Sequence, residues 1–163
     1  MITPVTPHDA TQICEIYNHY IDTSVISFES SPVSEREMRE RIAQVAKLNL
    51  PWLVAKSAEE VVGYAYATQW KARHAYRYCV EITIYLAPDT KAKGIGSALY
   101  EALFAALQQL DVHAVMACIA LPNAHSIALH EKFGMRKVAH FEKVGFKFDR
   151  WLDVGYWQVN LKQ

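Results

Sequence analysis

The sequence predicts a single α/β domain (α+β in some schemes), residues 1–163, with a mixed, mostly antiparallel sheet flanked by helices. Apolar and polar side chains alternate along residues 79–86, which is typical of a half-buried strand. A glycine-containing turn follows, and leucines then recur at helical spacing between Ile95 and Leu110. The run from His113 to Leu121 is almost wholly apolar, which favours a strand buried on both faces. Strands interleaved with helices in this way indicate an α/β architecture.

Two helices and three further strands are expected before the central strand. Asp9 with Gln12, and Ser34 with Glu37, have the spacing of a capping box, so a helix should begin behind each pair. The strands are expected at Ile2–Val5, Trp52–Lys56 and Val61–Gln69.

After the apolar run, Asn123 should cap a helix that ends at Gly134. Two last strands, at Met135–Val144 and Trp151–Leu161, should flank a polar turn at residues 145–150. The expected element order is β α α β β β α β α β β.

Composition argues against several classes of protein. Lys plus Arg and Asp plus Glu both number 17, so no charge excess suggests binding to nucleic acid or to an anionic membrane. Met1 is followed by no basic and apolar leader, and no apolar run reaches the about 18–20 residues of a membrane helix. The cysteines Cys14, Cys79 and Cys118 form no CxxC and are expected to be small buried hydrophobes. We therefore expect a cytoplasmic protein.

The turn after the central strand contains Lys91, Lys93, Gly94 and Gly96. A helix that begins at such a turn leaves its first backbone N–H groups unpaired, and its dipole and the lysines favour a phosphorylated ligand there. In the alternative interpretation, the glycines only shape a tight turn beside solvated lysines. The turn is not a P-loop, because the Gly-Lys-Ser/Thr end is missing.

Glu81 and His130 are the candidate catalytic side chains. Glu is rare inside strands, so Glu81 is either a buried ion-pair partner of Arg73 or Arg77, or a functional carboxylate. Burial in a cleft would raise its pKa, as a general base requires. His130 is either structural or solvated, or it faces the same cleft as Glu81.

Metal and thiol chemistry are not expected. His125 and His130 are five residues apart and therefore not on one helical face, and no Cys or carboxylate completes a zinc set. Cys79 has no neighbouring His that would activate it as a nucleophile.

Cations alternate with aromatic residues between Lys71 and Arg77. This loop is either a solvated connection or a recognition site for an anionic small molecule, because an Arg fork matches a carboxylate. In the second case, Tyr76 and Phe28 would wall its apolar side.

The stretch Lys91–Gly96 after a strand resembles the acyl-CoA pyrophosphate loop, Gln/Arg-x-x-Gly-x-Gly/Ala, of the GNAT superfamily of N-acetyltransferases. Within that superfamily, nearly the whole chain is similar to the phosphinothricin and methionine sulfoximine N-acetyltransferases. The matching stretches are Ile16–Ile21, Pro51–Ala55, Trp70–Arg73, Val80–Glu81, Leu121–Asn123, Leu129–Glu131 and Asp153–Gln158. Lys91 replaces the usual Gln or Arg, which should adjust phosphate affinity rather than abolish it. His130 replaces the Tyr of the wider superfamily, in agreement with this branch.

The resemblance implies an enzyme that transfers acetyl from acetyl-CoA directly to the α-amino group of a small anionic amino-acid analogue. The implied analogues are phosphinothricin, methionine sulfoximine and methionine sulfone. Glu81 would be the general base and His130 the acid, with no metal. Backbone groups of Ile84, Tyr85 and Leu86 would bind the pantetheine. The other implied cofactor contacts are Lys91, Ala92, Lys93, Gly94, Ile95, Gly96, Ser97, Asn123 and Ser126. The implied substrate contacts are Phe28, Lys71, Ala72, Arg73, Tyr76, Glu81, Ile82 and Thr83, with Arg73 on a carboxylate or phosphinate.

Several alternatives remain open at this point. They are an N-acetyltransferase for other L-amino acids or small amines, a protein-acetylating enzyme, and a catalytically silent acyl-CoA-binding module. The aromatic residues within 147–157 belong either to the core or to a subunit interface. By resemblance to relatives of this branch, we expect a homodimer.

Overall fold

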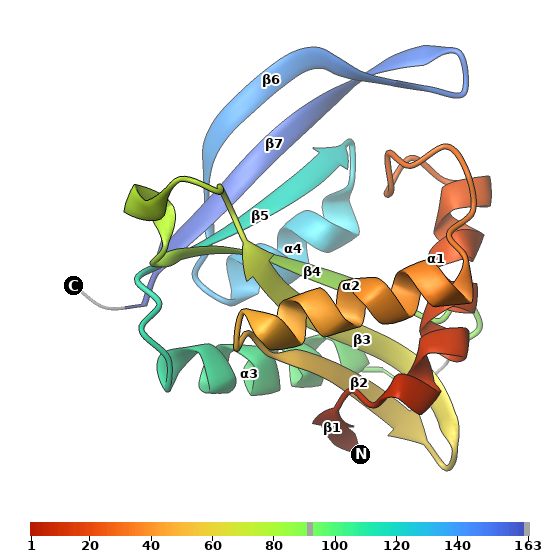
Figure 1. The fold of residues 1–163 in the computed structure, drawn as a ribbon. Helices are drawn as coiled ribbons and strands as arrows, with labels where there is room; N and C mark the ends of the chain where they lie inside the picture. The colour runs from red at the N-terminus through yellow and green to blue at the C-terminus, as the bar shows by residue number, and fades with distance from the viewer. Residues whose placement is uncertain (91–92, 162–163) are drawn as a thin grey trace.

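The computed structural model describes residues 1–90 and 93–161, and these form one seven-stranded sheet (Figure 1). The strand order is β1-β2-β3-β4-β5-β7-β6, and neighbouring strands are antiparallel except for the parallel pair β4–β5. The strands are β1 (Ile2–Pro4), β2 (Trp52–Ser57), β3 (Glu60–Gln69), β4 (Cys79–Leu86), β5 (Ala114–Leu121), β6 (Arg136–Lys147) and β7 (Arg150–Asn160). The predicted fold class and element order are confirmed.

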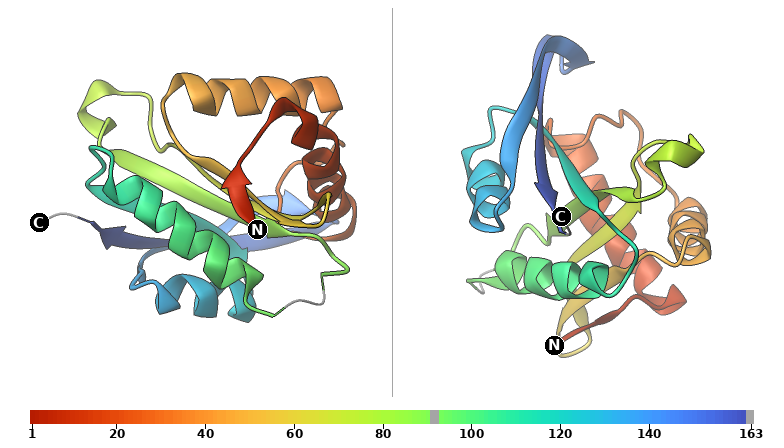
Figure 2. Two further views of the ribbon diagram at one scale, coloured as in Figure 1. Left: turned by 90° about the horizontal axis from the view of Figure 1, so that it is seen from below. Right: turned by 90° about the vertical axis from the view of Figure 1, so that its left-hand side faces the viewer.

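Helices cover both faces of the sheet (Figure 2). The helices are α1 (Ala10–Thr23) and α2 (Glu35–Lys47) on one face, and α3 (Ile95–Gln108) and α4 (Ala124–Lys132) on the other, with short 3-10 turns η1 (Pro7–Asp9) and η2 (His74–Tyr76). Ser34 caps α2 as predicted, because its hydroxyl accepts a hydrogen bond of 3.1 Å from the backbone N–H of Glu37. None of the described helices has the length and hydrophobicity needed to cross a membrane.

The alternation predicted along β4 is confirmed. Val80 and Ile82 are 2% and 3% exposed and belong to the core under α3. Tyr85 packs against the core under α1 and α2. Because side chains alternate along a strand, Glu81 and Thr83 share the Tyr85 face.

The capping box predicted for α1 is wrong. The Asp9 carboxylate accepts from the backbone N–H and hydroxyl of Thr6, and it forms a 2.6 Å ion pair with Lys56 of β2. The side-chain oxygen of Gln12 accepts from the backbone N–H of Val61 on β3. These two residues therefore connect the start of α1 to the sheet. The spacing of Asp9 and Gln12 in the sequence does not distinguish this role from helix capping.

The polar turn predicted at residues 145–150 is also wrong. β6 continues to Lys147 and β7 begins at Arg150, so the turn consists only of Phe148 and Asp149, with φ of 51° and 55°. Two positive φ angles are typical of the two-residue turns whose twist matches a hairpin. The β6–β7 hairpin is therefore longer than predicted, and its tip reaches the loop that follows α1 (Figure 1).

Candidate active site

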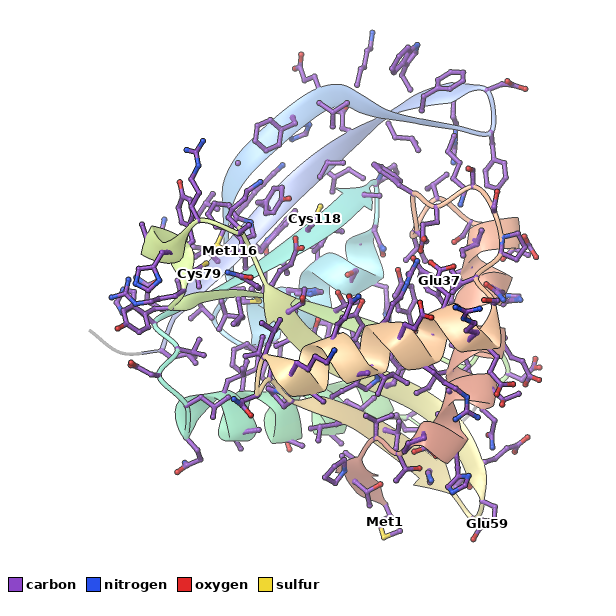
Figure 3. All side chains as sticks on the ribbon, in the orientation of Figure 1. Met1, Glu37, Glu59, Cys79, Met116 and Cys118 are labelled. Carbon is purple, nitrogen blue, oxygen red and sulfur yellow. The ribbon has the colours of Figure 1, made fainter. Side chains whose placement is uncertain are left out.

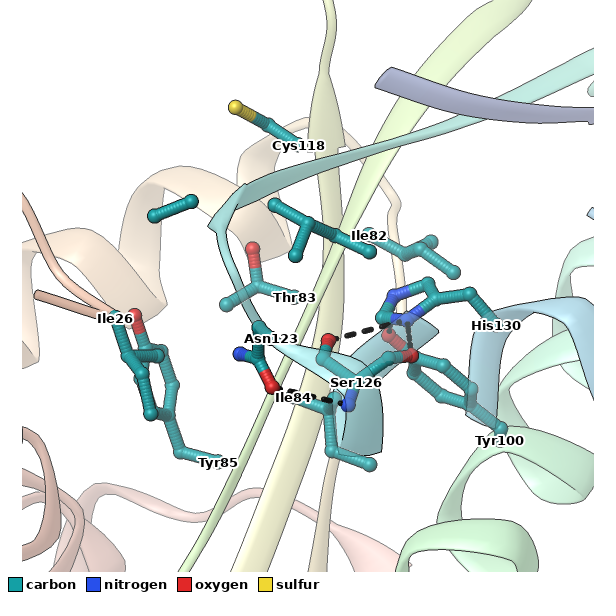
Figure 4. A pocket seen from close by; sticks show the side chains of 12 residues that line it. Ile26, Ile82, Thr83, Ile84, Tyr85, Tyr100, Cys118, Asn123, Ser126 and His130 are labelled. Atoms are coloured by element: carbon teal, nitrogen blue, oxygen red, sulfur yellow. Dashed lines mark hydrogen bonds between the residues drawn. The ribbon is translucent and has the colours of Figure 1, made fainter. Parts of the chain in front are cut away.

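The parallel strands β4 and β5 are paired only at their starts. Their pairing joins residues 79–81 to residues 114–116, although the strands run on to Leu86 and Leu121. A cavity of about 100 Å³, the gap cavity, lies where they separate (Figure 4). Its lining residues are Ile26, Ile82, Thr83, Ile84, Tyr85, Tyr100, Cys118, Ile119, Ala120, Asn123, Ser126 and His130. Beyond Glu81, β4 thus presents a backbone edge to which an extended ligand can bind as an added strand.

A larger groove of about 670 Å³, the α3 groove, continues from this gap to the N-terminus of α3. All the described residues that the resemblance implies for the cofactor line it: Ile84, Tyr85, Leu86, Lys93, Gly94, Ile95, Gly96, Ser97, Asn123 and Ser126. Lys91 and Ala92 lie outside the described residues. The structure therefore brings the predicted cofactor set together along one groove.

The α3 end of the groove has the features of an anion site. Gly94 precedes the helix at φ +86°, a conformation that side-chain-bearing residues rarely adopt. The first N–H groups of a helix have no intrahelical acceptor, and here they belong to the groove-lining residues Ile95, Gly96 and Ser97. Lys132 of α4 adds a cation, with its Nζ 2.8 Å from the Ser97 hydroxyl. Helix N-terminus and cation together favour a phosphate.

Two side chains fix the walls of the α3 groove. The Tyr20 hydroxyl of α1 donates a 2.6 Å hydrogen bond to the carbonyl of Leu86. The Asn123 side chain accepts from the backbone N–H of Ser126 at 3.1 Å and caps α4. The carbonyl of Leu86 is therefore already bonded to protein, whereas the Asn123 amide still has its N–H donors for a ligand.

His130 is 4% exposed, and both of its ring nitrogens are hydrogen-bonded (Figure 4). Nδ1 lies 2.6 Å from the carbonyl oxygen of Ser126, and Nε2 lies 2.8 Å from the hydroxyl of Tyr100. Because a carbonyl only accepts, Nδ1 carries the proton and Nε2 accepts from Tyr100. Burial lowers the pKa of His130, partly offset by the Ser126 bond, and so favours the neutral ring.

Glu81 is half-buried on β4, at the last position paired with β5 and opposite Thr68 of β3. Burial raises the pKa of Glu81 above its usual value, and the nearby Lys71 partly offsets this. Among the described residues, Glu81 forms no ion pair with Arg73 or Arg77. The ion-pair alternative is therefore not observed, and the carboxylate has the environment expected of a base.

A third cavity of about 430 Å³, the tyrosine cavity, lies on the same face of the sheet as Glu81. Its lining residues are Tyr17, Ile26, Ser27, Phe28, Glu29, Tyr66, Thr83, Tyr85, Cys118, Ala120 and Val154. Phe28 and Thr83 were implied as substrate contacts. Thr83 also lines the gap cavity, and it stands two residues beyond Glu81 on one strand face. Glu81 itself lines none of the three cavities, so Thr83 is what relates its strand face to both of them.

The cationic loop is not brought into these cavities. Lys71, Ala72, Arg73 and Tyr76 are exposed, and none lines the gap cavity, the α3 groove or the tyrosine cavity. Trp70 organises the loop, because the Lys71 Nζ lies 5.2 Å from its ring centroid and the Tyr76 ring packs edge-on at 5.3 Å. The role of Lys71, Ala72, Arg73 and Tyr76 in substrate binding stays a prediction.

The cysteines differ from expectation. Cys14 is buried, but Cys79 is half-buried, and Cys118 is exposed and lines both the gap cavity and the tyrosine cavity (Figure 3). In residues 1–90 and 93–161, no group of three or more His, Cys, Asp or Glu is arranged to hold a metal ion.

Sequence reasoning missed several lining residues. Tyr17, Tyr20 and Tyr100 line these cavities but are not among the site residues that the sequence predicts. Lys132 lies beside Gly134 at the end of its helix, where a cation near a helix terminus is ordinary. Only the hydrogen bond from Lys132 to Ser97, which joins α4 to the start of α3, shows that Lys132 belongs to the anion site.

Comparison with known proteins agrees with this geometry. Residues 2–155 match the family model described as the acetyltransferase (GNAT) domain. The chain belongs to the GNAT acetyltransferase family. It is 38% identical over 157 residues to phosphinothricin N-acetyltransferase of Streptomyces viridochromogenes, covering 96% of this chain and 85% of that one. It is 33% identical to L-methionine sulfoximine/L-methionine sulfone acetyltransferase of Pseudomonas aeruginosa, covering 94% and 90%.

A similar solved structure is the GNAT phosphinothricin acetyltransferase of Sinorhizobium meliloti in complex with acetyl-CoA. It has a TM-score of 0.95 and 35% identity, and the match covers 99% of this chain and 88% of that one. The chain is accordingly an acetyl-CoA-dependent N-acetyltransferase of the phosphinothricin and methionine sulfoximine branch.

Proposed function

We propose that the enzyme acetylates the α-amino group of a small anionic amino-acid analogue such as phosphinothricin, methionine sulfoximine or methionine sulfone. Acetyl-CoA would lie in the α3 groove, with its diphosphate at the start of α3 and its thioester in the gap cavity. The observation that carries the proposal is Glu81. Its half-buried carboxylate has no ion-pair partner in the described chain. Glu81 itself lines none of the three cavities, but it shares a strand face with Thr83, which lines both the gap cavity and the tyrosine cavity.

The chemistry is direct transfer. The substrate ammonium gives one proton to Glu81, directly or through a water, and the freed amine attacks the thioester carbonyl. A C–N bond forms, and the oxyanion is stabilised by backbone N–H groups of β4 beyond Glu81. The C–S bond then breaks, and a second nitrogen proton passes to the departing sulfur. Holding both reactants in adjoining cavities supplies much of the rate enhancement.

The acid role of His130 is a separate part of the proposal. In the arrangement described, the only ring proton of the neutral side chain is donated to the Ser126 carbonyl. Protonation of the thiolate by His130 would therefore require Tyr100 to release Nε2 and a second proton to reach the ring. We expect His130 to contribute much less to turnover than Glu81.

The tyrosine cavity would hold the substrate side chain. Burial raises the pKa of Tyr66 and of Tyr85, so both hydroxyls stay protonated and can donate to sulfoximine, sulfone or phosphinate oxygens. The α-carboxylate would then face Lys71 and Arg73, because Lys71 is close enough to Glu81 to affect its pKa.

The test is release of free thiol from acetyl-CoA with a panel of amines. We expect the highest kcat/KM for phosphinothricin, methionine sulfoximine or methionine sulfone, with low values for common L-amino acids and a lysine peptide. Saturable acetyl-CoA binding without release for any amine would overturn the enzymatic assignment of this site.

A second candidate is acetylation of other L-amino acids. It is favoured by the lining of the tyrosine cavity, which contains no Lys or Arg and includes the apolar residues Ile26, Phe28 and Val154. The same panel decides, since this candidate predicts higher kcat/KM for neutral L-amino acids than for phosphinothricin.

We also propose that the enzyme is a homodimer. Six large apolar side chains on the β6–β7 hairpin are 38% to 61% exposed. They are Val138, Phe141, Val144, Phe146, Phe148 and Trp151. Exposed apolar side chains gathered in this way are typical of a protein–protein interface. Sedimentation equilibrium should give twice the mass of one chain, and Phe146→Glu with Trp151→Glu should shift it to one.

A further inference from the structure

The loop between α1 and α2 forms part of the tyrosine cavity. Within residues 24–30, here named the acceptor loop, Ile26, Ser27, Phe28 and Glu29 line this cavity. Ile26 also lines the gap cavity and the α3 groove. The acceptor loop contains no helix or strand, so bonds from other elements must fix its position.

One of these bonds comes from Lys147 at the far end of the chain. Lys147 is the last residue of β6 and is only 7% exposed. Its Nζ donates to the carbonyl of Ile21 at 2.8 Å and to the carbonyl of Ser27 at 2.7 Å. Among the described residues it forms no ion pair. A buried ammonium is costly unless it is hydrogen-bonded, and these two carbonyls supply its bonds.

The hairpin contacts the acceptor loop at a second point. The Phe28 ring packs against the backbone of Gly145, so closely that a Cβ built on Gly145 would lie 2.4 Å from a ring carbon. Lys147 and Gly145 both belong to β6, and Figure 1 shows this end of the hairpin beside the loop. The longer hairpin found in the structure is what allows it to reach this position.

The other end of the acceptor loop is held from α2 and α1. The Arg41 guanidinium donates to both carboxylate oxygens of Glu29, at 3.0 Å and 2.6 Å. The Tyr17 hydroxyl bonds Glu29 and lies 3.0 Å from the Ser27 hydroxyl. These partners fix Glu29, whereas the carbonyl of Ser27 accepts from Lys147 and from no other residue in the part of the chain that the structure describes. The two attachments therefore act on different parts of the loop.

We propose that Lys147 is a positioning residue for the amine substrate, because its two hydrogen bonds join the acceptor loop, at Ser27, to the last turns of α1, at Ile21, and so hold the loop in place as a wall of the tyrosine cavity. The proposal rests on the proposed function, in that the tyrosine cavity receives the amine. Lys147 reaches no reacting atom. Its loss should therefore raise KM for the amine and change KM for acetyl-CoA little, because Ile26 is the one acceptor-loop residue among the described residues that line the α3 groove.

The experiment compares Lys147→Met with Arg150→Met. Met keeps the approximate length of the lysine but donates no hydrogen bond. Arg150 is the cross-strand partner of Lys147 and is exposed, and its side chain makes no hydrogen bond to the described residues, so it is a matched control. We expect Lys147→Met to raise KM for methionine sulfoximine about tenfold, the effect of losing a bond to a charged group, with KM for acetyl-CoA within twofold. Arg150→Met should leave both values near wild type.

Hydrogen exchange of the free protein gives a readout that does not depend on activity. Amides of the acceptor loop should exchange faster in Lys147→Met than in Arg150→Met, while those of α3 stay unchanged. Gly145→Ala, which displaces Phe28 without removing a hydrogen bond, should also raise the amine KM selectively. Equal acceptor-loop exchange in the two Met variants would overturn the proposal, as would an equal rise of both KM values. A wild-type enzyme inactive on every amine would instead refute the proposed function, and the exchange result would still stand.

Discussion

The α3 groove and the tyrosine cavity meet at Ile26 and Tyr85, yet they are assembled in opposite ways. About half of the groove's described lining is close together in the sequence, at residues 84–86, 90 and 93–97, and most of the rest belongs to α4 and its cap. The cavity is built from side chains of α1, the acceptor loop, β3, β4, β5 and β7, which are far apart in the sequence. A binding site whose residues are close together in the sequence can therefore be recognised from the sequence, whereas one made of distant residues needs the fold.

Glu81→Gln should have the largest effect on activity. It should lower the rate of the chemical step and leave binding in the α3 groove and in the tyrosine cavity unchanged. Gln keeps the shape but cannot accept the ammonium proton, so kcat should fall about 10²–10⁴-fold. Acetyl-CoA affinity, measured by calorimetry, should stay within twofold. Glu101→Gln, an exposed change on α3, is the control. Unchanged turnover would remove Glu81 from the reaction.

Gly94→Ala should affect the α3 groove alone. No atom of residues 1–90 or 93–161 lies within 4 Å of a Cβ built on Gly94, so we expect the change to act through the positive φ, at about 1–2 kcal/mol. If the turn must hold this conformation to bind the diphosphate, KM for acetyl-CoA should rise about 5–30-fold with the amine KM unchanged.

Gly134→Ala is the matched control for this change. Gly134 has a similar φ of +80° but lies at the end of α4 and lines none of the three cavities. The Gly134→Ala variant should lose thermal stability without a change in KM for acetyl-CoA. An equal rise of the acetyl-CoA KM in both variants would mean that strain, not the groove, is being measured.

Arg73→Ala should give the smallest effect, on the substrate side. The guanidinium is exposed, so its pairing with a substrate anion should be worth no more than a surface ion pair, and the amine KM should rise about two- to fivefold. Arg77→Ala is the comparison, because that side chain stacks on Tyr78 and bonds the His74 carbonyl. A larger effect of Arg77→Ala would assign the anion to that cation instead.

The sequence predicts features that depend on neighbouring residues, and it does not predict contacts between distant ones. The alternation around Glu81, the cap at Ser34 and the turn at Gly94 are local, and the structure confirms each of these features. Two other contacts join elements that are distant in the sequence. They are the ion pair between Asp9 and Lys56 and the hydrogen bond from Lys147 to the carbonyl of Ser27 in the acceptor loop. No periodicity or spacing reports such contacts, and so spacing alone was misleading for Asp9.

The hydrogen bonds of His130 illustrate the limit within the site itself. Its place on the last helix could be predicted from sequence, but its bonds to Tyr100 and Ser126 could not. Those bonds determine which nitrogen carries the proton, and therefore which chemistry is open to the ring.

The pH dependence of kcat/KM, measured for wild type, Lys71→Met and Glu81→Gln, tests the central claim most directly. A base must be ionised, and burial raises the pKa of Glu81, so wild-type activity should fall as pH drops through a pKa higher than that of an ordinary Glu. Removing the Lys71 cation, which lowers that pKa, should move the acidic limb to higher pH. Glu81→Gln should lack this limb in its residual activity. An acidic limb at the same pH in all three proteins would contradict the assignment of Glu81 as the base.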